Sequence, residues 1–575
     1  MNTKTERRML ALLTEWCSAL LRLQLDLPAD ERLHGGLLCP ACGMIHGRCH
    51  EAVYPLLCAA AHTGNMAFRD AAVRLFRWGL NLRSADGGSR NDLKSDWKGV
   101  TAFAAIALHD ALKNHGSLLT EAQRTEWETR LAEMSEWLHQ NLTLQTPAYL
   151  NYYAANACAL ALAGTCFSRS DYLETAQTLA AYCLGHVSEN GLIYGEGRPN
   201  DAVSPKGCRA VDFGYNAEET LPALTRYASV TGNGQMLARC RALWRAQLEW
   251  MLPDGAWDNS VGTRSFKWTY WGSRTADGCL AELFALGKDD PVFAEAAMRH
   301  LNLLERCTHG GLLAGGPDYA RNGEPVCVHH TFCHAKALAA ALDAGAAEPA
   351  RAALPGDDPE SIRYYPELDV YRLAAGGWRM DVSGYDFVYP GAAHATGGSI
   401  SLLWHKAAGA LVAVGQVDDN LKEPHNQQLP VRPEQNRCAC PRLEAVWQGK
   451  SYGQHSCAVA RMTAEERPDG AEVQVKAVLC DKSGAALPGN GACSLEYRLT
   501  PASLTVSGSV SPALAGRAQF VLPLNGDKAE IEIMRGSLCG EPAAFFRAAP
   551  GFLGKEYRIA PDAGGRFCLS VRVRE

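Results

Sequence analysis

The residues best suited to chemistry open a helix of small residues, in the segment Asn151–Asn156. The segment reads Asn-Tyr-Tyr-Ala-Ala-Asn and continues into alanine and leucine. An amide and a tyrosine hydroxyl at the mouth of a buried helix can donate hydrogen bonds to a carboxylate and neutralise its charge. Buried amides also commonly cap or bridge helices. The segment therefore has two interpretations, a carboxylate contact and a helix cap.

A second candidate is Tyr215, which directly precedes a helix that begins near Asn216 and carries Glu218 and Glu219 in its first turn. The positive end of that helix would favour a phenolate. A tyrosine that acts as an acid or base needs such tuning, because its unperturbed pKa is about 10. The alternative is a tyrosine whose ring only packs on the start of the helix.

A third candidate region, residues 257–275, interleaves aromatic and basic side chains. Aromatic rings stack on the faces of sugars, and guanidinium groups pair with carboxylate or sulfate. Aromatic residues near helix ends are also common in cores. We predict contacts with an acidic sugar chain from Arg264, Lys267, Trp268, Trp271 and Arg274.

Histidines supply two further candidates. His330 and His334 are four residues apart and fall on one helical face, but no Glu follows His330 as a zinc protease motif requires. We therefore assign His330 to substrate binding. His394 precedes a predicted strand. On a loop at a sheet edge it could reach a cleft and act as a base, or it could be an ordinary surface histidine.

The pair Cys39-x-x-Cys42, followed by His46 and His50, has ligand types that zinc prefers. However, a lone CxxC is a weak signal, and no second CxxC follows at finger-like spacing. The competing interpretation is a glycine-rich loop that lines the end of the helical half. We predict no metal ligands from this pattern and leave a divalent cofactor open.

Hydrophobic periodicity divides the chain into two halves. Apolar residues recur at three-to-four spacing in a series of predicted helices joined by short loops. These cover Glu51–His62, Met66–Leu82, Trp97–Asn114, Glu121–Gln140, Tyr152–Ala163, Asp171–Leu184, Ala217–Ser229, Gln235–Met251, Ala276–Leu286 and His330–Leu342. Paired helices of this kind can stack as a superhelix or close into an α/α toroid, and the periodicity does not decide between them.

After about Pro355, apolar and polar residues alternate instead, which indicates antiparallel sheets packed face to face. The predicted strands are Ala471–Leu479, Cys493–Leu499, Leu504–Val510, Ala518–Leu524, Ala529–Met534 and Phe567–Val573. The alanine-rich stretch Ala344–Asp358 is the predicted linker. We therefore expect an α+β chain with domains at 1–350 and 351–575.

Composition excludes some partners. The net charge is −6 over 575 residues, and no basic run stands out, so nucleic acid is not expected. No apolar run approaches the roughly 20 residues that span a bilayer. The first residues, Met1–Leu27, suggest an amphipathic helix and not a signal peptide. The 21 cysteines follow no disulfide framework. A cytoplasmic location is therefore expected, with the oligomeric state open.

Together these motifs resemble the heparinase II/III-like polysaccharide lyases. Asn151-Tyr152-x-x-Ala155-Asn156 resembles the Asn-His-x-x-x-Asn helix start of that family, with Tyr152 where histidine is usual. Tyr215 resembles its catalytic tyrosine, and His394 resembles the histidine that completes the site. The family also has a β-domain metal site of His and Asp. Here Gln416 stands where the Asp is expected.

The resemblance implies an N-terminal α/α toroid, an incomplete barrel of helical hairpins, followed by an antiparallel β-sandwich. It also implies β-elimination on uronic-acid glycans of the glycosaminoglycan type, with Asn151, Tyr215 and His394 as catalytic residues and Tyr152 as a substrate contact. Asn151 is then the amide that binds the uronate carboxylate, and Asn156 has a structural role. Two alternatives remain: an α/α-barrel hydrolase of uronides, with carboxylates such as Glu196, Asp212, Asp258 or Asp277, and a non-catalytic sugar-binding protein.

Overall fold

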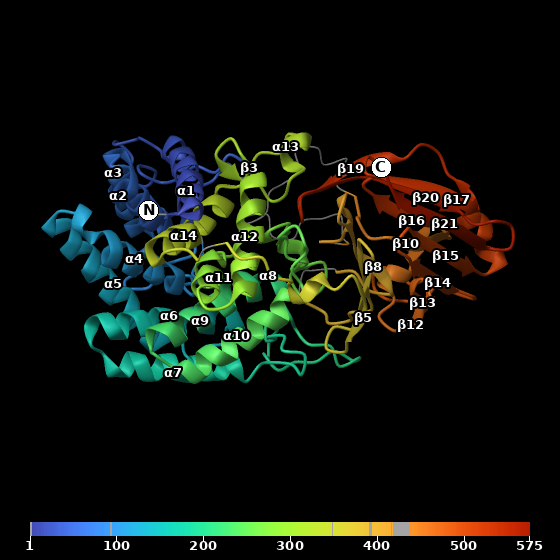
Figure 1. Cartoon of the computed structure of the whole chain (residues 1–575), viewed down its shortest axis with the longest axis horizontal. Helices are drawn as coiled ribbons and strands as arrows, with labels where there is room; N and C mark the ends of the chain where they lie inside the picture. The colour runs from blue at the N-terminus through green and yellow to red at the C-terminus, as the bar shows by residue number, and fades with distance from the viewer. Residues whose placement is uncertain are drawn as a thin grey trace.

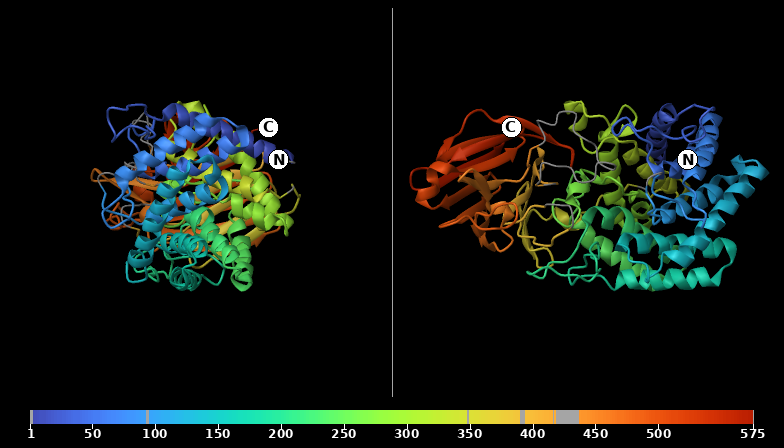
Figure 2. Two further views of the ribbon diagram at one scale, coloured as in Figure 1. Left: turned by 90° about the vertical axis from the view of Figure 1, so that its left-hand side faces the viewer. Right: turned by 180° about the vertical axis from the view of Figure 1, so that it is seen from behind.

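The computed structural model describes residues 3–92, 95–347, 349–389, 394–415, 417 and 437–574. It has a helical half and a half built of antiparallel sheets, with the amino terminus in the first and the carboxyl terminus in the second (Figure 1). Figure 2 shows the molecule from its helical end and from behind. The last long helix ends at Ala344 and the first strand of the second half begins at Glu360. The α+β architecture expected from the sequence is therefore present.

Inner helices form a ring in the helical half, and each is paired with an outer helix. The inner helices are α2 (Val53–Thr63), α4 (Thr101–His115), α6 (Leu150–Phe167), α9 (Leu221–Val230), α11 (Leu280–Gly287) and α14 (Val328–Ala344). Their outer partners are α3 (Met66–Gly79), α5 (Glu121–Asn141), α7 (Ser170–Leu184), α10 (Gly234–Leu248), α12 (Pro291–Arg306) and α1 (Lys4–Leu23). The ring closes because α14 contacts both α11 and α2. The expected α/α toroid of helical hairpins is therefore present.

Composition explains which helices are inside. Helix α6 is buried on nearly all sides and consists largely of alanine, which allows close approach to α4, α7 and α9. Outer helices such as α3 instead bury one stripe, which includes Phe68, Leu75 and Trp78, and expose the other. This is the distribution expected of a helix with one solvent face.

The described residues of the β half form three antiparallel sheets that share one core. The first has the order β5-β6-β7-β8-β9, over Glu360–Tyr365, Val370–Ala375, Trp378–Ser383, Ser399–His405 and Gly409–Ala413. The second comprises β10 (Arg442–Trp447), β11 (Lys450–Gly453), β16 (Ala518–Leu524), β18 (Ser537–Leu538), β19 (Ala543–Arg547) and β20 (Phe552–Ala560). The third comprises β12 (Arg461–Arg467), β13 (Gly470–Val478), β14 (Ala492–Leu499), β15 (Leu504–Val510), β17 (Ala529–Arg535) and β21 (Arg566–Val573).

The first sheet lies between the helical ring and the other sheets (Figure 1). At this junction Trp250 packs on Tyr365 with ring centroids 4.9 Å apart. A buried ion pair joins Arg372 of β6 to Asp258 at 3.1 Å. After β7, the Tyr385 hydroxyl donates to the Arg209 carbonyl at 2.8 Å and the Tyr389 hydroxyl accepts from Arg264 Nε at 3.1 Å, so the β half contacts the helical half here.

No helix in the described part of the chain is both long and apolar enough to cross a lipid bilayer.

Candidate active site

The centre of the site is an unusual turn at the start of the α9 segment. Asp212 accepts a hydrogen bond from the backbone N–H of Tyr215 at 3.0 Å and so caps the short helix α8 (Phe213–Tyr215). A π-helical turn, Asn216–Thr220, follows before α9 begins. Such π-turns are frequent at functional sites. This turn buries Tyr215, Glu218 and Glu219 on the inner side of the ring.

The hydroxyl of Tyr215 is held by cations. Lys267 Nζ donates to it at 3.0 Å, and the guanidinium of Arg264 lies 4.4 Å from the centre of the ring. The hydroxyl also forms a short hydrogen bond with the Thr275 hydroxyl. Burial raises the pKa of Tyr215 to about 12, although Lys267 and Arg264 oppose this rise. This raised pKa contradicts the expected phenolate, so Tyr215 is a neutral phenol at neutral pH.

Arg264 is fixed by contacts from both halves of the molecule. Its Nη2 donates to Glu196 Oε2 at 2.7 Å, and its Nε donates to the hydroxyl of Tyr389 at 3.1 Å. Tyr389 lies on the loop after β7, so the β half contributes directly to the site. Burial raises the pKa of Glu196 to about 7, against the effect of Arg264. Glu196 also accepts from the backbone N–H of Asn151 at 3.2 Å, which connects Arg264 to the start of α6.

Asn151 and Glu219 form the second part of the site. The amide of Asn151 donates to Glu219 Oε2 at 2.6 Å, and both residues are buried. The other amide atom, Asn151 Oδ1, has no hydrogen-bond partner among the described residues. Burial, reinforced by Asp277, raises the pKa of Glu219 to about 8. At neutral pH Glu219 is therefore largely protonated, and an acid in that state can donate to an anionic ligand.

A second row of charged residues, Arg48, Asp277 and Lys336, lies behind Asn151 and Glu219. Arg48 Nη1 donates to the Thr275 carbonyl at 2.7 Å and lies 3.7 Å from Glu219 Oε1. The same guanidinium also pairs with Asp277. Lys336 Nζ lies 2.9 Å from Asp277 Oδ2. These contacts fix both Thr275, which touches Tyr215, and Glu219.

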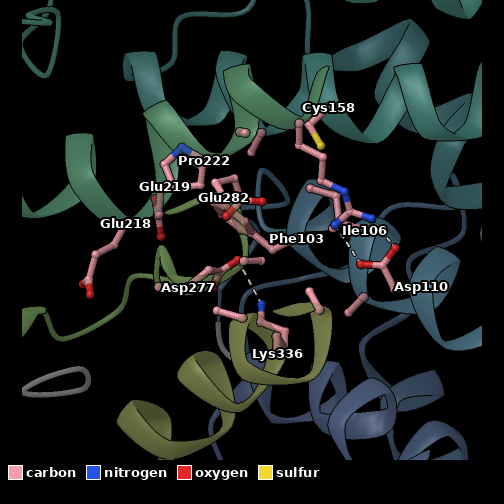
Figure 3. A pocket seen from close by; sticks show the side chains of 18 of the residues that line it. Phe103, Ile106, Asp110, Cys158, Glu218, Glu219, Pro222, Asp277, Glu282 and Lys336 are labelled. Carbon is pink, nitrogen blue, oxygen red and sulfur yellow. Dashed lines mark hydrogen bonds and ion pairs between the residues drawn. The ribbon is translucent and has the colours of Figure 1, made fainter. Parts of the chain in front are cut away.

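A cavity of about 80 Å³ lies inside the ring of inner helices beside this row. Figure 3 shows Glu219, Asp277 and Lys336 on its wall, with Glu218 leaving the same turn in another direction. Glu218 accepts a hydrogen bond from His334 Nε2 at 2.9 Å. Tyr215 and Asn151 do not line the cavity. A sugar that contacts Tyr215 therefore binds outside this cavity.

Several predicted substrate contacts are instead buried structural residues. Trp268 and Trp271 are 0 % exposed, and their indole N–H groups donate to the carbonyls of Trp257 and Ala314 at 2.8 and 2.7 Å. Their rings therefore present no free face on which a sugar could stack. Arg274 is also buried and donates to the Phe266 carbonyl within the same loop. Aromatic and basic residues interleave here because the loop is part of the core.

His330 is another core residue. Its Nδ1–H donates to the Leu313 carbonyl at 3.2 Å, and its ring contacts Trp271 at 5.4 Å. Burial lowers the pKa of His330 to about 3, so the ring is neutral. His330 therefore lies behind the loop and not against the site.

Tyr152 and His394 lie at the margin of the site. The Tyr152 ring packs edge-on against Trp97 at 5.1 Å, and Glu219, Lys267 and Arg264 all influence its pKa. His394 Nε2–H donates to the Tyr385 carbonyl at 3.0 Å, which leaves Nδ1 without a partner among the described residues. Burial lowers the pKa of His394 to about 4, so its free lone pair is available at neutral pH.

Sequence reasoning missed Arg48, Thr275, Tyr389 and Lys336 as parts of the site. Arg48 lies in the glycine-rich loop after Cys42, whose cysteines and histidines indicate metal ligands and give no signal for an arginine in the site. The other three are single polar residues without a motif. Glu219 was noticed, but only as a favourable charge near a helix start. Its carboxyl faces Asn151 because of the π-turn, which no sequence pattern revealed.

The described residues of the β half do not form the metal site of His and Asp that the family resemblance implies. Gln416 lies outside the described residues. Among those described, the groups of candidate ligands that converge closely enough to hold an ion all lie in the helical half. His394 belongs to none of them. No step of the chemistry is therefore assigned to a β-domain metal.

Comparison with known proteins agrees with this arrangement. The Ulvan lyase N-terminal domain family matches residues 13–356, and the Ulvan lyase C-terminal domain family matches residues 362–533. The broad-specificity ulvan lyase of Formosa agariphila is 35% identical over 535 residues, which cover 91% of this chain and 83% of the relative.

Two solved structures are also similar. A mutant of the heparan sulfate lyase HepC from Pedobacter heparinus has a TM-score of 0.49 at 11% identity, over 100% of this chain and 84% of that chain. The chondroitin AC lyase of Streptomyces coelicolor A3 has a TM-score of 0.49 at 12% identity, over 99% and 79%. The family matches, which cover both halves of the sequence, carry the assignment: this chain belongs to the ulvan lyase family and is a polysaccharide lyase.

Proposed function

We propose that this enzyme cleaves ulvan, an acidic polysaccharide, by β-elimination at a uronic acid residue. The support for this substrate is the 35% identity to a broad-specificity ulvan lyase. The support for the reaction is the neutral Tyr215 beside two cations and the amide–carboxyl pair of Asn151 and Glu219. In this reaction the C5–H bond and the C4–O4 bond break, and a C4=C5 double bond forms.

Asn151 and Glu219 neutralise the uronate carboxylate. The C5 proton is weakly acidic until that charge is compensated, because its removal builds an enolate-like anion. A protonated Glu219 and the Asn151 amide supply donors to this anion in a buried setting. Preorganised donors of this kind typically contribute about 3 kcal/mol each to the transition state.

Tyr215 protonates the departing O4. Its pKa of about 12 keeps the proton on the phenol at rest. Lys267 Nζ, 3.0 Å from the phenolic oxygen, stabilises the phenolate that forms as the proton leaves. His394 removes the C5 proton through its free Nδ1. Two groups whose surroundings shift their pKa values in opposite directions, as for Tyr215 and His394, can serve as the acid and the base of one site.

The contact between Lys267 and the Tyr215 hydroxyl carries this proposal, because it places a buried cation on the oxygen of the proposed acid. Arg264 adds a second cation over the same ring at 4.4 Å.

The direct test is incubation of the purified enzyme with ulvan, and in parallel with heparan sulfate, chondroitin sulfate and alginate. Ultraviolet absorbance of the new unsaturated uronide should appear with ulvan and be weaker or absent with the other chains. Reducing ends that form without this absorbance would refute β-elimination. Absorbance with another chain but not with ulvan would refute the substrate and leave the reaction class intact.

We also propose a reducing compartment such as the cytoplasm. All 21 cysteines are free thiols, including exposed Cys166 and Cys539. Disulfides are rare in reducing compartments. Cell fractionation of the source organism, followed by alkylation of the thiols before lysis, tests this location. Recovery with the secreted proteins would contradict it.

A further inference from the structure

Three thiols and an imidazole converge at the edge of the helical ring, away from Tyr215. They belong to Cys39, Cys42, His46 and Cys327, and their ligand atoms all lie within 4.8 Å of one another. The Sγ atoms of Cys39 and Cys42 lie 3.7 and 3.9 Å from Cys327 Sγ, and His46 Nε2 lies 3.6 Å from the same sulfur. All but Cys42 are buried.

These distances fit a tetrahedron around one zinc ion. Zinc binds thiolate sulfur at about 2.3 Å and imidazole nitrogen at about 2.0–2.1 Å. With tetrahedral angles, two such sulfurs are about 3.8 Å apart, and a sulfur and a nitrogen are about 3.6 Å apart. A disulfide would need a sulfur–sulfur distance of about 2.05 Å, far shorter than the observed contacts.

The backbone presents the first three ligands from one tight turn. Leu38 and Ile45 form an isolated antiparallel bridge, and within it the N–H of Gly43 donates to the carbonyl of Cys39 at 2.9 Å. Gly43 has φ +63 and an open space at its missing Cβ, so this turn requires a left-handed residue there. The turn aims both cysteines at one point, which is the function of a C-x-x-C zinc knuckle.

The fourth ligand comes from the other end of the helical half. Cys327 is the N-cap residue of α14 and lies 288 residues after Cys39. His50, which the sequence also offered as a ligand, is not part of the cluster, because its Nδ1–H donates to the Gly47 carbonyl at 2.7 Å. The ligand set is thus three cysteines and one histidine.

We propose that Cys39, Cys42, His46 and Cys327 bind a structural zinc ion. Four protein ligands fill the coordination sphere of zinc and leave no position for water or substrate, which distinguishes structural from catalytic zinc. Soft thiolates with imidazole favour this ion over magnesium or calcium. The ion also explains why three thiols, whose negative charges would repel one another, are packed together.

The zinc ion ties the first loop of the chain to the last inner helix. The loop continues from His46 directly into Gly47–Ala52, which carries Arg48 into the second row of the active site. Helix α14 carries His334 and Lys336, which contact Glu218 and Asp277. Zinc therefore acts as a positioning element for both sides of this charged row and contacts no reacting atom.

Metal content of the full-length enzyme tests this proposal. The protein, purified without chelator or added metal, should contain about one zinc ion per chain. Cys42→Ser, at the partly exposed ligand, should reduce this content toward zero. Cys183→Ala, at a buried cysteine of α7 outside the cluster, should retain about one ion. Exchange with cobalt should give the visible absorption bands of a tetrahedral thiolate site in the parent enzyme and not in Cys42→Ser.

If Cys42→Ser does not fold, the proposal is still tested, because the zinc content and cobalt spectrum of the parent enzyme are measured independently. A parent enzyme that contains no zinc, and takes up none after reduction, would overturn the proposal. So would a Cys39–Cys327 disulfide, seen as two missing thiols under denaturing conditions. Full zinc content in both Cys42→Ser and Cys327→Ser would overturn the ligand assignment.

Discussion

Two buried polar clusters in the helical half balance charge in different ways. Around Tyr215, the cation Arg264 pairs with Glu196, Lys267 donates to the phenolic oxygen, and Asn151 Oδ1 keeps no hydrogen-bond partner among the described residues. Around Cys327, every ligand atom points at its neighbours, and the proposed zinc ion would occupy them all. A catalytic site thus keeps hydrogen-bonding atoms unpaired, whereas a structural site pairs all of its polar atoms.

The largest expected effect is that of Tyr215→Phe, which removes the acid and little else. Loss of a general acid typically costs 10²–10⁴-fold in rate, and we expect roughly 10³-fold in kcat. The melting temperature should change little, since the ring remains packed under Arg264. Initial rates from ultraviolet absorbance and a thermal melt check both. A variant that keeps more than about a tenth of the parent kcat would remove Tyr215 from the reaction.

Asn151 and Asn156 of α6 allow a catalytic and a structural amide to be compared within one helix. Asn151→Ala removes a donor to the developing charge and should lower kcat by about 10²–10³-fold. Asn156 instead donates to the carbonyls of Leu142 and Leu138 at 2.7 and 3.4 Å. Asn156→Ala should therefore leave kcat within a few-fold and lower the free energy of unfolding by about 1–3 kcal/mol. Equal losses of kcat in both variants would contradict the distinction.

Lys267→Met tests whether a cation supports the phenol. Without Lys267 Nζ at 3.0 Å, the phenolate is less stable, and kcat should fall by about 10²-fold. The exposed Lys288, whose Nζ donates to the Ala344 carbonyl at 2.8 Å, supplies the matched control Lys288→Met, and its kcat should equal that of the parent. Steady-state kinetics separate kcat from KM. A change in KM alone would assign Lys267 to substrate binding.

The smallest effect is expected for Glu219→Gln near neutral pH, where the parent carboxyl is already protonated. Above its pKa of about 8 the parent loses this proton, and the resulting carboxylate repels the uronate, so kcat/KM should fall as the pH rises. Glutamine cannot ionise and should remove this alkaline fall. The measurement is kcat/KM between about pH 6 and 10. If kcat/KM of Glu219→Gln still decreases at alkaline pH as in the parent, the decrease arises from the ionisation of another group.

Much of the fold could be predicted because it depends on local periodicity. The predicted helices and strands agree with the structure to within a few residues at most ends, for example Ala471–Leu479 against β13 at Gly470–Val478. The strands β6 and β7 were not located from the sequence, because their near-continuous burial gives little alternation. Membership of the ulvan lyase family shows the lyase class and excludes the hydrolase and non-catalytic alternatives.

The site could be predicted only in part. Asn151, Tyr215, Arg264 and Lys267 do come together. Trp268, Trp271, Arg274 and His330 were mistaken for ligand contacts, because an aromatic and basic loop has the same composition whether it faces a sugar or the core. His394 stays a prediction: its Nδ1 has no hydrogen-bond partner among the described residues and is suitable for a base, but the residue contacts Tyr385 and not Tyr215 in that part of the chain.

The sequence by itself determined the order of helices and strands and the C-x-x-C turn, because these depend on neighbours within a few residues. Only the tertiary structure decided that Tyr215 is a buried neutral phenol, that Glu219 faces Asn151, and that Cys327 joins Cys39 across 288 residues. Burial and long-range contacts set pKa values and ligand sets, and neither is encoded in local spacing.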